Sequence, residues 1–190
     1  MKVNGVHYRS IWYDHELGKV NIIDQRRLPH DFRVVTIETL NDFAVAISDM
    51  WVRGAPLIGA TAAYGMAVAM AKDSSNDALQ DAYNVLIQTR PTAVNLRWSL
   101  DRLKLALSRI PPKNRSRDAL RFAHQVAEED VSNNKRIGEF GLEIIKNIAA
   151  KKPAGEPVRM LTHCNAGWPA TVDWGTATSP MYHAHEAGIP

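Results

Sequence analysis

The longest apolar run of the sequence is Leu57–Ala71, LIGATAAYGMAVAMA. A helix that spans a lipid bilayer needs about 20 apolar residues, so this run is too short for one. It is apolar on nearly every side and rich in alanine and glycine, which predicts a buried helix that other helices approach closely. We therefore expect a helix from about Pro56 to Lys72 in the middle of the fold.

The segments before and after this helix have clear hydrophobic periods. Residues 1 to about 37 contain three β-type segments, at 7–13, 19–24 and 33–37, and predict a small antiparallel sheet. Thr39 and Asp42 resemble a capping box that starts a helix running to about Val52. Three further helices are expected at 76–88, 92–110 and about 116–150.

The last part of the sequence predicts a single βα unit. Val158–His163 is a candidate buried strand, and a helix is expected from about Pro169 to Glu186. A parallel sheet needs several such units to bury its strands on both faces. We therefore expect an α/β fold with a sheet-plus-helices domain at 1–125 and, at 126–190, a linking helix and the start of a second, incomplete domain. We expect the sequence to be the first part of a larger protein or a shortened relative of one.

The composition is typical of a globular protein, with 45% hydrophobic and 23% charged residues. The net charge of +3 comes from 23 basic and 20 acidic residues scattered along the chain, which gives weak support for nucleic-acid binding. The N-terminus lacks the layout of a signal peptide, and one cysteine cannot form an internal disulfide. We expect a cytoplasmic protein that binds neither nucleic acid nor a membrane.

Few other polar residues indicate a site. His183 and His185 lie two positions apart on a predicted helix, about 200° around its axis, and cannot readily bind one metal ion. We expect no metal and no cofactor. Asp24, in IIDQRRLP, is expected either to orient Arg26 or Arg27 or to cap a turn.

Two arginines lie just ahead of predicted helices, in Arg53–Pro56 (RGAP) and Arg90–Thr92 (RPT). A cation at a helix N-terminus is unfavourable by about 0.3 to 1 kcal/mol, so something should compensate for each charge. A bound phosphate or carboxylate would do so, because it can accept from first-turn N–H groups and from a bidentate arginine, and Gly54 and Ala55 allow the backbone to approach it closely. Pairing of each arginine with a carboxylate, or its solvation, is the alternative.

The only cysteine, Cys164, lies between the candidate strand and the predicted helix, in LTHCNAG at 161–167. Open α/β sheets bind ligands at the carboxyl ends of their strands, and a helix N-terminus favours the thiolate form. A buried, inert thiol is the alternative, since lone cysteines are commonly core residues. His163 is not expected to pair with Cys164, because successive strand residues point to opposite faces.

Four blocks together strongly resemble the family of aldose–ketose isomerases that act on 5-methylthioribose 1-phosphate in methionine salvage, which is related to the regulatory subunits of translation initiation factor 2B. The blocks are IDQRRLP at 23–29, VRGAPLIGATAAYG at 52–65, TRPTAVNLRW at 89–98 and LTHCNAGWPATVDWGTATSPMYHAHEAGIP at 161–190. They follow one another in order across essentially the whole chain.

The resemblance implies an N-terminal domain of a small sheet and helices, a Rossmann-like C-terminal domain, and a homodimer in the full-length form. It implies that Arg53, Gly54, Ala55 and Arg90 bind the phosphate of a small sugar phosphate. It also implies that Cys164 is one of two catalytic residues, which replaces the interpretation of an inert thiol.

The sequence departs from the family pattern in two respects. The second catalytic residue of the family, an aspartate, belongs to later blocks that this sequence lacks, and Asp173, expected on the helix after Cys164, is not that residue. Pro169 stands where the family usually has leucine, and it removes an N–H group beside Cys164. We expect this chain alone to be inactive or nearly so.

The implied reaction converts 5-methylthioribose 1-phosphate to 5-methylthioribulose 1-phosphate. The phosphate on the anomeric carbon prevents ordinary ring opening, so an acid at the ring oxygen and a base near C2 are needed. Two alternatives remain: a non-catalytic regulatory or scaffold protein of the initiation factor 2B type, and an isomerase of another pentose 1-phosphate, such as ribose 1,5-bisphosphate. A second phosphate would call for extra basic residues, whereas a methylthio group calls for an apolar pocket.

Overall fold

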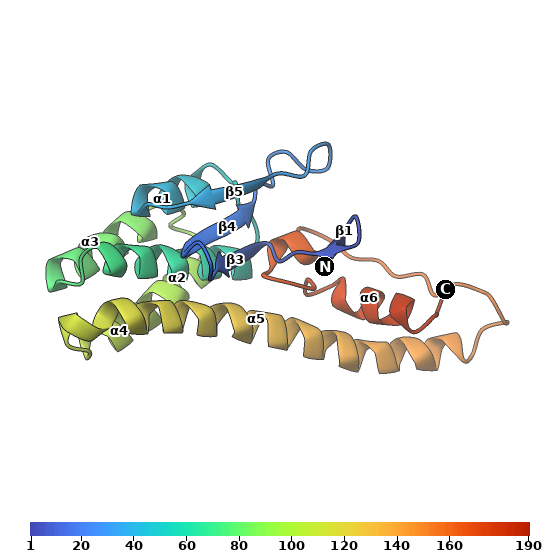
Figure 1. The fold of residues 1–190 in the computed structure, drawn as a ribbon. Coiled ribbons are helices and arrows are strands. Elements are labelled where there is room, and N and C mark those ends of the chain that lie inside the picture. The colour runs from blue at the N-terminus through green and yellow to red at the C-terminus, as the bar shows by residue number, and fades with distance from the viewer.

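The computed structural model describes residues 1–190 and places small antiparallel sheets beside six α-helices, the longest of which runs beneath the rest (Figure 1). The strands are β1 (Lys2–Val3), β2 (Val6–His7), β3 (Ile11–Asp14), β4 (Lys19–Ile23) and β5 (Val34–Ile37). The helices are α1 (Leu40–Ser48), α2 (Ala55–Lys72), α3 (Asn76–Ile87), α4 (Val94–Ser108), α5 (Pro112–Ala149), the 3₁₀ turn η1 (Trp168–Ala170) and α6 (Ser179–Glu186).

The predicted antiparallel sheet is confirmed, with strand order β3-β4-β5. Ile11 pairs with Ile22, and Val20 pairs with Ile37, and all four side chains are buried in the core. The strand expected at 7–13 is shorter and begins at Ile11, because β1 and β2 form a separate hairpin around Asn4–Gly5. Both turn residues have positive φ, which is the conformation that Asn-Gly favours in a two-residue hairpin turn.

Helix α2 is the element against which α1, α3, α4 and α5 pack, as its sequence predicts. The stretch Leu57–Ala67 is buried without interruption. A Cβ at Gly59 would lie 3.0 Å from the carbonyl oxygen of Asn95 in α4, and one at Gly65 would lie 3.1 Å from Phe43 in α1. Small residues on α2 therefore set how closely the neighbouring helices approach.

The ends of several helices are held by polar side chains. The capping box of α1 is confirmed: the Thr39 hydroxyl accepts from the N–H of Asp42 at 3.2 Å, and the Asp42 carboxylate accepts from the N–H of Thr39 at 2.9 Å. Arg115, which is 3% exposed, donates to the carbonyl oxygens of Leu107, Ile110 and Ser74. Its charge thus lies at the negative end of α4.

Helix α5 spans 38 residues, or roughly 57 Å, without a break. The expected domain boundary at 125/126 falls inside it, so one helix carries the chain from the first part to the second. Its C-terminal half packs against α6, where a Cβ at Gly138 would lie 2.3 Å from the Ser179 hydroxyl and one at Gly141 would lie 2.5 Å from Pro180.

Two expectations for the C-terminal segment are wrong. Residues 158–163 form no strand, because no other strand lies beside them to pair with, and Leu161 is 99% exposed. The helix expected over 169–186 is reduced to η1 and α6, joined by a loop. Trp174 and Gly175 in this loop both have positive φ, which interrupts a right-handed helix.

Asp173, which was expected on that helix, instead lies buried in the loop. One of its carboxylate oxygens accepts from the amino group of Met1 at 2.6 Å, and the other lies 2.7 Å from Nε2 of His7. Its neighbour Val172 belongs to the same hydrophobic core as the sheet and α2. The loop is therefore tied to the N-terminal part of the molecule.

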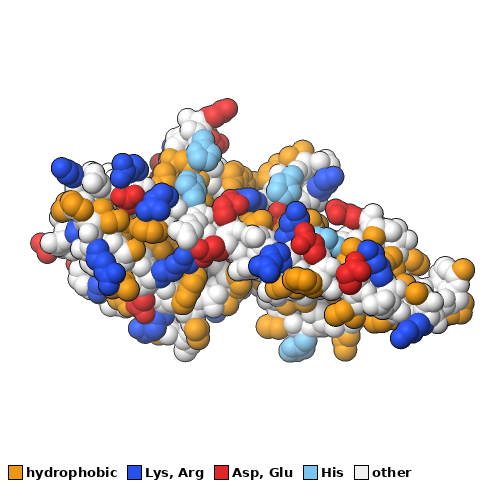
Figure 2. All heavy atoms as spheres, turned by 90° about the horizontal axis from the view of Figure 1, so that it is seen from below, with side chains coloured by type: hydrophobic (Ala, Val, Ile, Leu, Met, Phe, Trp, Pro, Cys, Tyr) orange, Lys and Arg blue, Asp and Glu red, His pale blue; other side chains and the backbone are white.

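The face below α5 carries charges of both signs, interspersed with hydrophobic side chains (Figure 2). The exposed hydrophobic residues of α5 recur at helical spacing along its C-terminal half: Ile137, Phe140, Ile144 and Ile148. None of the helices combines the length and the apolar character needed to cross a lipid bilayer.

Enlarging a small residue of α2 tests the central position of this helix. Ala63 is 0% exposed, so Ala63→Leu should lower the free energy of unfolding by about 1 to 3 kcal/mol through overpacking. Ala71 on the same helix is exposed, and Ala71→Leu should change the free energy of unfolding by less than about 0.5 kcal/mol. Urea denaturation followed by circular dichroism measures both; equal losses would contradict the packing described.

Candidate active site

The start of α2 is a helix N-terminus without a side-chain cap. Its N-cap is Gly54, Pro56 follows in the first turn, and the first N–H of the helix to find a main-chain acceptor there is that of Ile58, which donates to the Gly54 carbonyl at 3.0 Å. The amides ahead of it lack intrahelical acceptors, and the helix dipole adds partial positive charge. This end of α2 therefore offers N–H donors to an anion.

Gly54 is required here by its conformation and by its surroundings. Its φ is 103°, and a Cβ would lie 2.3 Å from the carbonyl oxygen of Ala170 and 2.4 Å from its Cα. The start of α2 thus lies directly against η1. This contact brings the chain that follows Cys164 next to the helix N-terminus.

The loop after Cys164 is fastened to three elements. Nε2 of Gln25, just after β4, donates to the Pro169 carbonyl at 2.6 Å. The N–H of Ser10 donates to the Val172 carbonyl at 2.9 Å, and the N–H of Val172 donates to the Asp130 carboxylate of α5 at 2.7 Å. Pro169 therefore contributes to this attachment through its carbonyl oxygen, and the N–H group that proline lacks is not needed for it.

Cys164 itself is exposed and has a φ of 68°. The alternative of a buried core thiol is therefore wrong. The helix N-terminus expected directly behind it is also absent, since only the short η1 follows before α6. The argument that a helix dipole favours the thiolate does not apply to this geometry, and the catalytic role of Cys164 remains a prediction.

Neither of the two predicted anion-binding arginines has a carboxylate partner. Arg53 is exposed, and its Nη2 donates to the Gln25 carbonyl at 3.3 Å. The ion pairs of the chain involve neither Arg53 nor Arg90. Arg90 is half-buried and lies in the α3–α4 connection, with Pro91–Ala93 between it and α4. The carboxylate-pairing alternative is therefore wrong for both.

The N-termini of α2 and α4 lie at the same end of the helical bundle. Gly59, in the second turn of α2, contacts Asn95, in the first turn of α4. The N-cap of α4 is Ala93, which also offers no side-chain cap. Two uncapped helix ends, each near an unpaired arginine, thus occupy one region of the molecule.

A cavity of about 530 Å³ adjoins the start of α2. It is lined by residues from the N-terminal hairpin, from the end of β4 and the connection after it, and from the loop after Cys164: Val3, Ile23, Gln25, Leu28, Pro29, Phe32, Arg53, Asn165, Trp168 and Pro169. It brings Arg53 together with Asn165, the neighbour of Cys164. Gly54, Ala55, Arg90 and Cys164 are not among its lining residues.

Sequence reasoning did not single out Gln25, Phe32 or Asn165 as site residues. Gln25 does lie beside Asp24 in the block IDQRRLP, and this position is the one feature of the sequence that could have indicated it as a site residue. Both alternatives for Asp24 are confirmed: its carboxylate accepts from Nε and Nη2 of Arg26 at 2.9 and 2.7 Å, and it caps the turn by accepting from the Arg26 N–H at 3.1 Å. These hydrogen bonds hold the pKa of Asp24 below its usual value.

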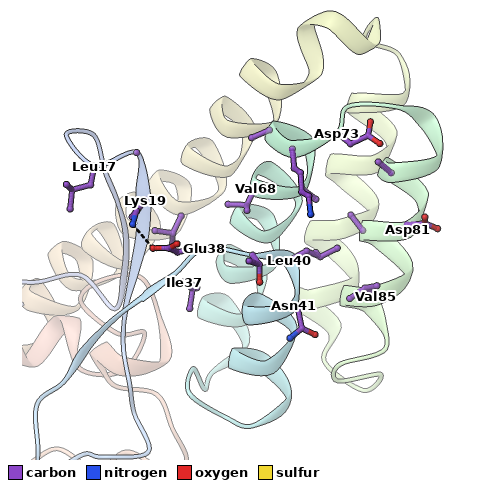
Figure 3. Close-up of a pocket in the computed structure, with 18 residues that line it drawn as sticks. Leu17, Lys19, Ile37, Glu38, Leu40, Asn41, Val68, Asp73, Asp81 and Val85 are labelled. Carbon is purple, nitrogen blue, oxygen red and sulfur yellow. Dashed lines mark hydrogen bonds and ion pairs between the residues drawn. The ribbon is translucent and has the colours of Figure 1, made fainter.

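A larger cavity, of about 850 Å³, lies at the other end of α2 (Figure 3). Its labelled residues come from the sheet, from α1, α2 and α3, and from the turns that join them, and the Lys19–Glu38 ion pair of 2.5 Å lies at one side. Val68 and Lys72 on its wall lie roughly 20 to 25 Å along the helix from Ala55. It holds none of the predicted site residues and is separate from the anion site.

The fold and the site define an α/β protein with two uncapped helix ends and two unpaired arginines, which suit an anionic ligand. The chain belongs to the initiation factor 2 subunit family, whose model matches residues 51–189. The resemblance expected from the sequence blocks is thus confirmed.

Named relatives include enzymes. The chain is 58% identical to a methylthioribose-1-phosphate isomerase from Rhizobium meliloti strain 1021, over 100% of this chain and 52% of the relative. Among solved structures it is similar to 5-methylthioribose 1-phosphate isomerase from Pyrococcus horikoshii OT3, with a TM-score of 0.81 and 37% identity over 96% of this chain and 51% of that one. The chain spans about half the length of the relatives it matches.

A second solved structure is equally similar. It is described as subunit delta of translation initiation factor eIF-2B from A. fulgidus, with a TM-score of 0.81 and 37% identity over 96% of this chain and 52% of that one. The fold alone therefore does not distinguish an isomerase from an initiation factor subunit.

Substitution of Gly54 tests the contact between α2 and η1. Gly54→Ala combines a positive φ with a clash against main-chain atoms, and should lower the free energy of unfolding by at least about 2 kcal/mol. Gly155 also has a positive φ but no atom within 4 Å of the added Cβ, so Gly155→Ala should cost about 1 kcal/mol. Denaturant unfolding compares them, and equal costs would argue against the close contact.

Asp130 makes the attachment of the loop depend on pH. Burial raises its pKa to about 6, although hydrogen bonds from Val172 and Asn134 favour the carboxylate. The folded state therefore binds more protons than the unfolded state between about pH 4 and 6. The stability contributed by Asp130 is present below this window and is lost as the pH rises through the folded-state pKa.

A variant without an ionisable group at residue 130 allows the contribution of Asp130 to be measured. The unfolding free energy of the wild type minus that of Asp130→Asn should fall from pH 4 to pH 7 by on the order of 2 kcal/mol. Urea titrations at a series of pH values give this difference, in which contributions from other groups cancel. A difference that is flat or rises with pH would contradict the assignment.

Proposed function

We propose that this chain provides the phosphate-binding side of a 5-methylthioribose-1-phosphate isomerase. The observation that carries the proposal is the uncapped start of α2 beside Arg53, an arginine without a carboxylate partner at the edge of a cavity. The 58% identity to a protein of this name supports it. The reaction is the conversion of 5-methylthioribose 1-phosphate to 5-methylthioribulose 1-phosphate in methionine salvage.

In this proposal the phosphate accepts hydrogen bonds from the first-turn amides of α2, including that of Ala55, and from the guanidinium groups of Arg53 and Arg90. Gly54 takes part through its backbone, while the space that a side chain would fill is occupied by Ala170. A dianion here is favoured both by the helix dipole and by charge-assisted hydrogen bonds. The sugar then lies over the cavity, on the side of the loop that carries Cys164.

Cys164 is proposed as one of the two groups that move protons on the sugar. The aldose ring is locked by its anomeric phosphate, so one group must protonate the ring oxygen while another acts near C2. Two observations support this role: the thiol is exposed, and its neighbour Asn165 lines the cavity. In the resembled family an aspartate from later blocks is the other group, and the hydrogen passes from C2 to C1 as a proton or as a hydride.

A regulatory protein of the initiation factor 2B type is the second candidate, and the similarity to the eIF-2B subunit structure supports it. A scaffold has no chemical need for unpaired arginines at uncapped helix ends, which favours the enzyme. A homodimer of the full-length form and a cytoplasmic location belong to the same proposal and rest on the family resemblance.

Binding, rather than turnover, tests the phosphate site, because we expect the 190-residue chain alone to show little or no activity. Arg53→Met should weaken the binding of ribose 1-phosphate by about 10- to 100-fold, since a charge-assisted hydrogen bond to the phosphate is lost. Isothermal titration calorimetry at low ionic strength measures it.

The matched control is Arg136→Met. Arg136 is exposed on α5, lies outside the cavity and takes part in no ion pair, so its loss changes the net charge equally. It should leave the affinity within about twofold, as expected for a distant, screened surface charge. If both variants lost affinity for ribose 1-phosphate to a similar extent, the change in net charge would explain the loss, and the result would contradict a phosphate site at Arg53.

A further inference from the structure

Two buried polar atoms in the wall of the cavity beside Arg53 have no hydrogen-bond partner within the chain. They are Oε1 of Gln25 and Nε1 of Trp168, and both residues line the cavity. Buried polar atoms without a partner are uncommon in folded proteins, and each is costly to leave unpaired. The phosphate contacts proposed above use neither atom.

The two atoms are of complementary kinds. The Pro169 carbonyl can only accept, so the 2.6 Å hydrogen bond from Gln25 assigns Nε2 to that side of the amide and leaves Oε1, an acceptor, unpaired. The indole N–H of Trp168 can only donate. A hydroxyl group can do both, so the hydroxyl groups of a ligand can satisfy the acceptor and the donor together.

Gln25 connects these atoms to the proposed phosphate site. Its main-chain carbonyl accepts from Nη2 of Arg53 at 3.3 Å, while its side chain holds Pro169, the residue after Trp168. The Ser10 hydroxyl donates to the Trp168 carbonyl at 3.3 Å and fixes that residue from the side of the sheet. The unpaired acceptor and the unpaired donor therefore lie in neighbouring parts of the wall that also carries Arg53.

A sugar 1-phosphate has hydroxyl groups in the corresponding place. In ribose 1-phosphate the hydroxyls at C2 and C3 follow directly on the carbon that bears the phosphate. A phosphate held at Arg53 therefore brings this pair of hydroxyls towards Gln25 and Trp168. A sugar that lacks one of them would leave a buried polar atom unpaired, which is the basis of selectivity for hydroxyl groups.

We propose that Gln25 and Trp168 bind the 2- and 3-hydroxyls of the sugar 1-phosphate and determine its selectivity for ribose over deoxyribose. Oε1 of Gln25 accepts from one hydroxyl, and Nε1 of Trp168 donates to the oxygen of the other. The inference rests on the proposed function and extends it to recognition of the sugar itself. The Gln25 amide thereby has two roles, since its nitrogen also holds the loop that follows Cys164.

The test compares three probes: ribose 1-phosphate, 2-deoxyribose 1-phosphate and 3-deoxyribose 1-phosphate. Calorimetric titration of the wild-type chain should give about tenfold tighter binding of ribose 1-phosphate than of either deoxy compound. Each deoxy compound loses one hydrogen bond and leaves its buried partner unpaired, and a loss of this kind corresponds to roughly that factor.

Two variants assign the hydroxyls to the two side chains. Trp168→Phe keeps an aromatic ring but removes the donor, so ribose 1-phosphate should bind about tenfold more weakly, while the deoxy compound that lacks the hydroxyl bound by Trp168 stays within about twofold. Gln25→Met removes the acceptor and should spare the other deoxy compound relative to ribose 1-phosphate. A merely structural disturbance would weaken all three probes equally and leave their ratios unchanged.

Trp98→Phe is the matched control, because Trp98 is 50% exposed on α4 and lies outside the cavity. It should leave the affinities and their ratios unchanged. Thermal unfolding checks that each variant is folded. Gln25→Met also loses the hydrogen bond to Pro169, so Trp168→Phe carries the test if Gln25→Met does not fold.

Failure of this inference and failure of the proposed function give different results. Equal affinity of the wild type for all three probes, with binding still dependent on Arg53, would overturn the hydroxyl contacts and leave the phosphate site intact. Unchanged ratios in Trp168→Phe would do the same. Absence of any Arg53-dependent binding of ribose 1-phosphate would overturn the proposed function and the hydroxyl contacts with it.

Discussion

The burial of α2 along most of its length is the constraint on which the rest of the structure depends. A helix surrounded by four others must carry small side chains where they approach, and Gly59 and Gly65 lie at two such contacts. The contact at Gly59 brings α4 alongside α2, so that both helices start at the same end of the bundle. A packing requirement in the core thereby places two sets of free N–H groups, and the arginines before them, in one region of the surface.

That region is completed by a segment far away in the sequence. Gly54 allows η1 to lie against the start of α2, and Gln25, Ser10 and Asp130 hold the following loop in place. The positive end of the helix and the chain after Cys164 therefore meet. In open α/β sheets the site lies at the end of a strand. Here it depends instead on three attachments of a loop.

The sequence predicted the helices at 40–149 and the three-stranded sheet well, because their periods and caps are local. It failed at 158–186, where apolar residues indicated a strand that has no neighbour to pair with and a helix that positive φ angles at Trp174 and Gly175 interrupt. Of the predicted site, the two arginines were identified from their place before helices, whereas the lack of carboxylate partners is seen only in the structure. Gln25, Phe32 and Asn165 were not, because only the tertiary arrangement brings segments near residues 3, 28 and 165 to one cavity.

The continuity of α5 also restricts how the chain can change during evolution. Asp130 faces the loop, and Gly138 and Gly141 face α6 from the same uninterrupted helix. An insertion of one residue between Asp130 and Gly138 would turn the glycines by about 100° and move them about 1.5 Å. Both would then point away from α6 and a side chain would take their place in the contact. Substitutions can accumulate on the outer face of α5, whereas its length between these two contacts has to stay constant.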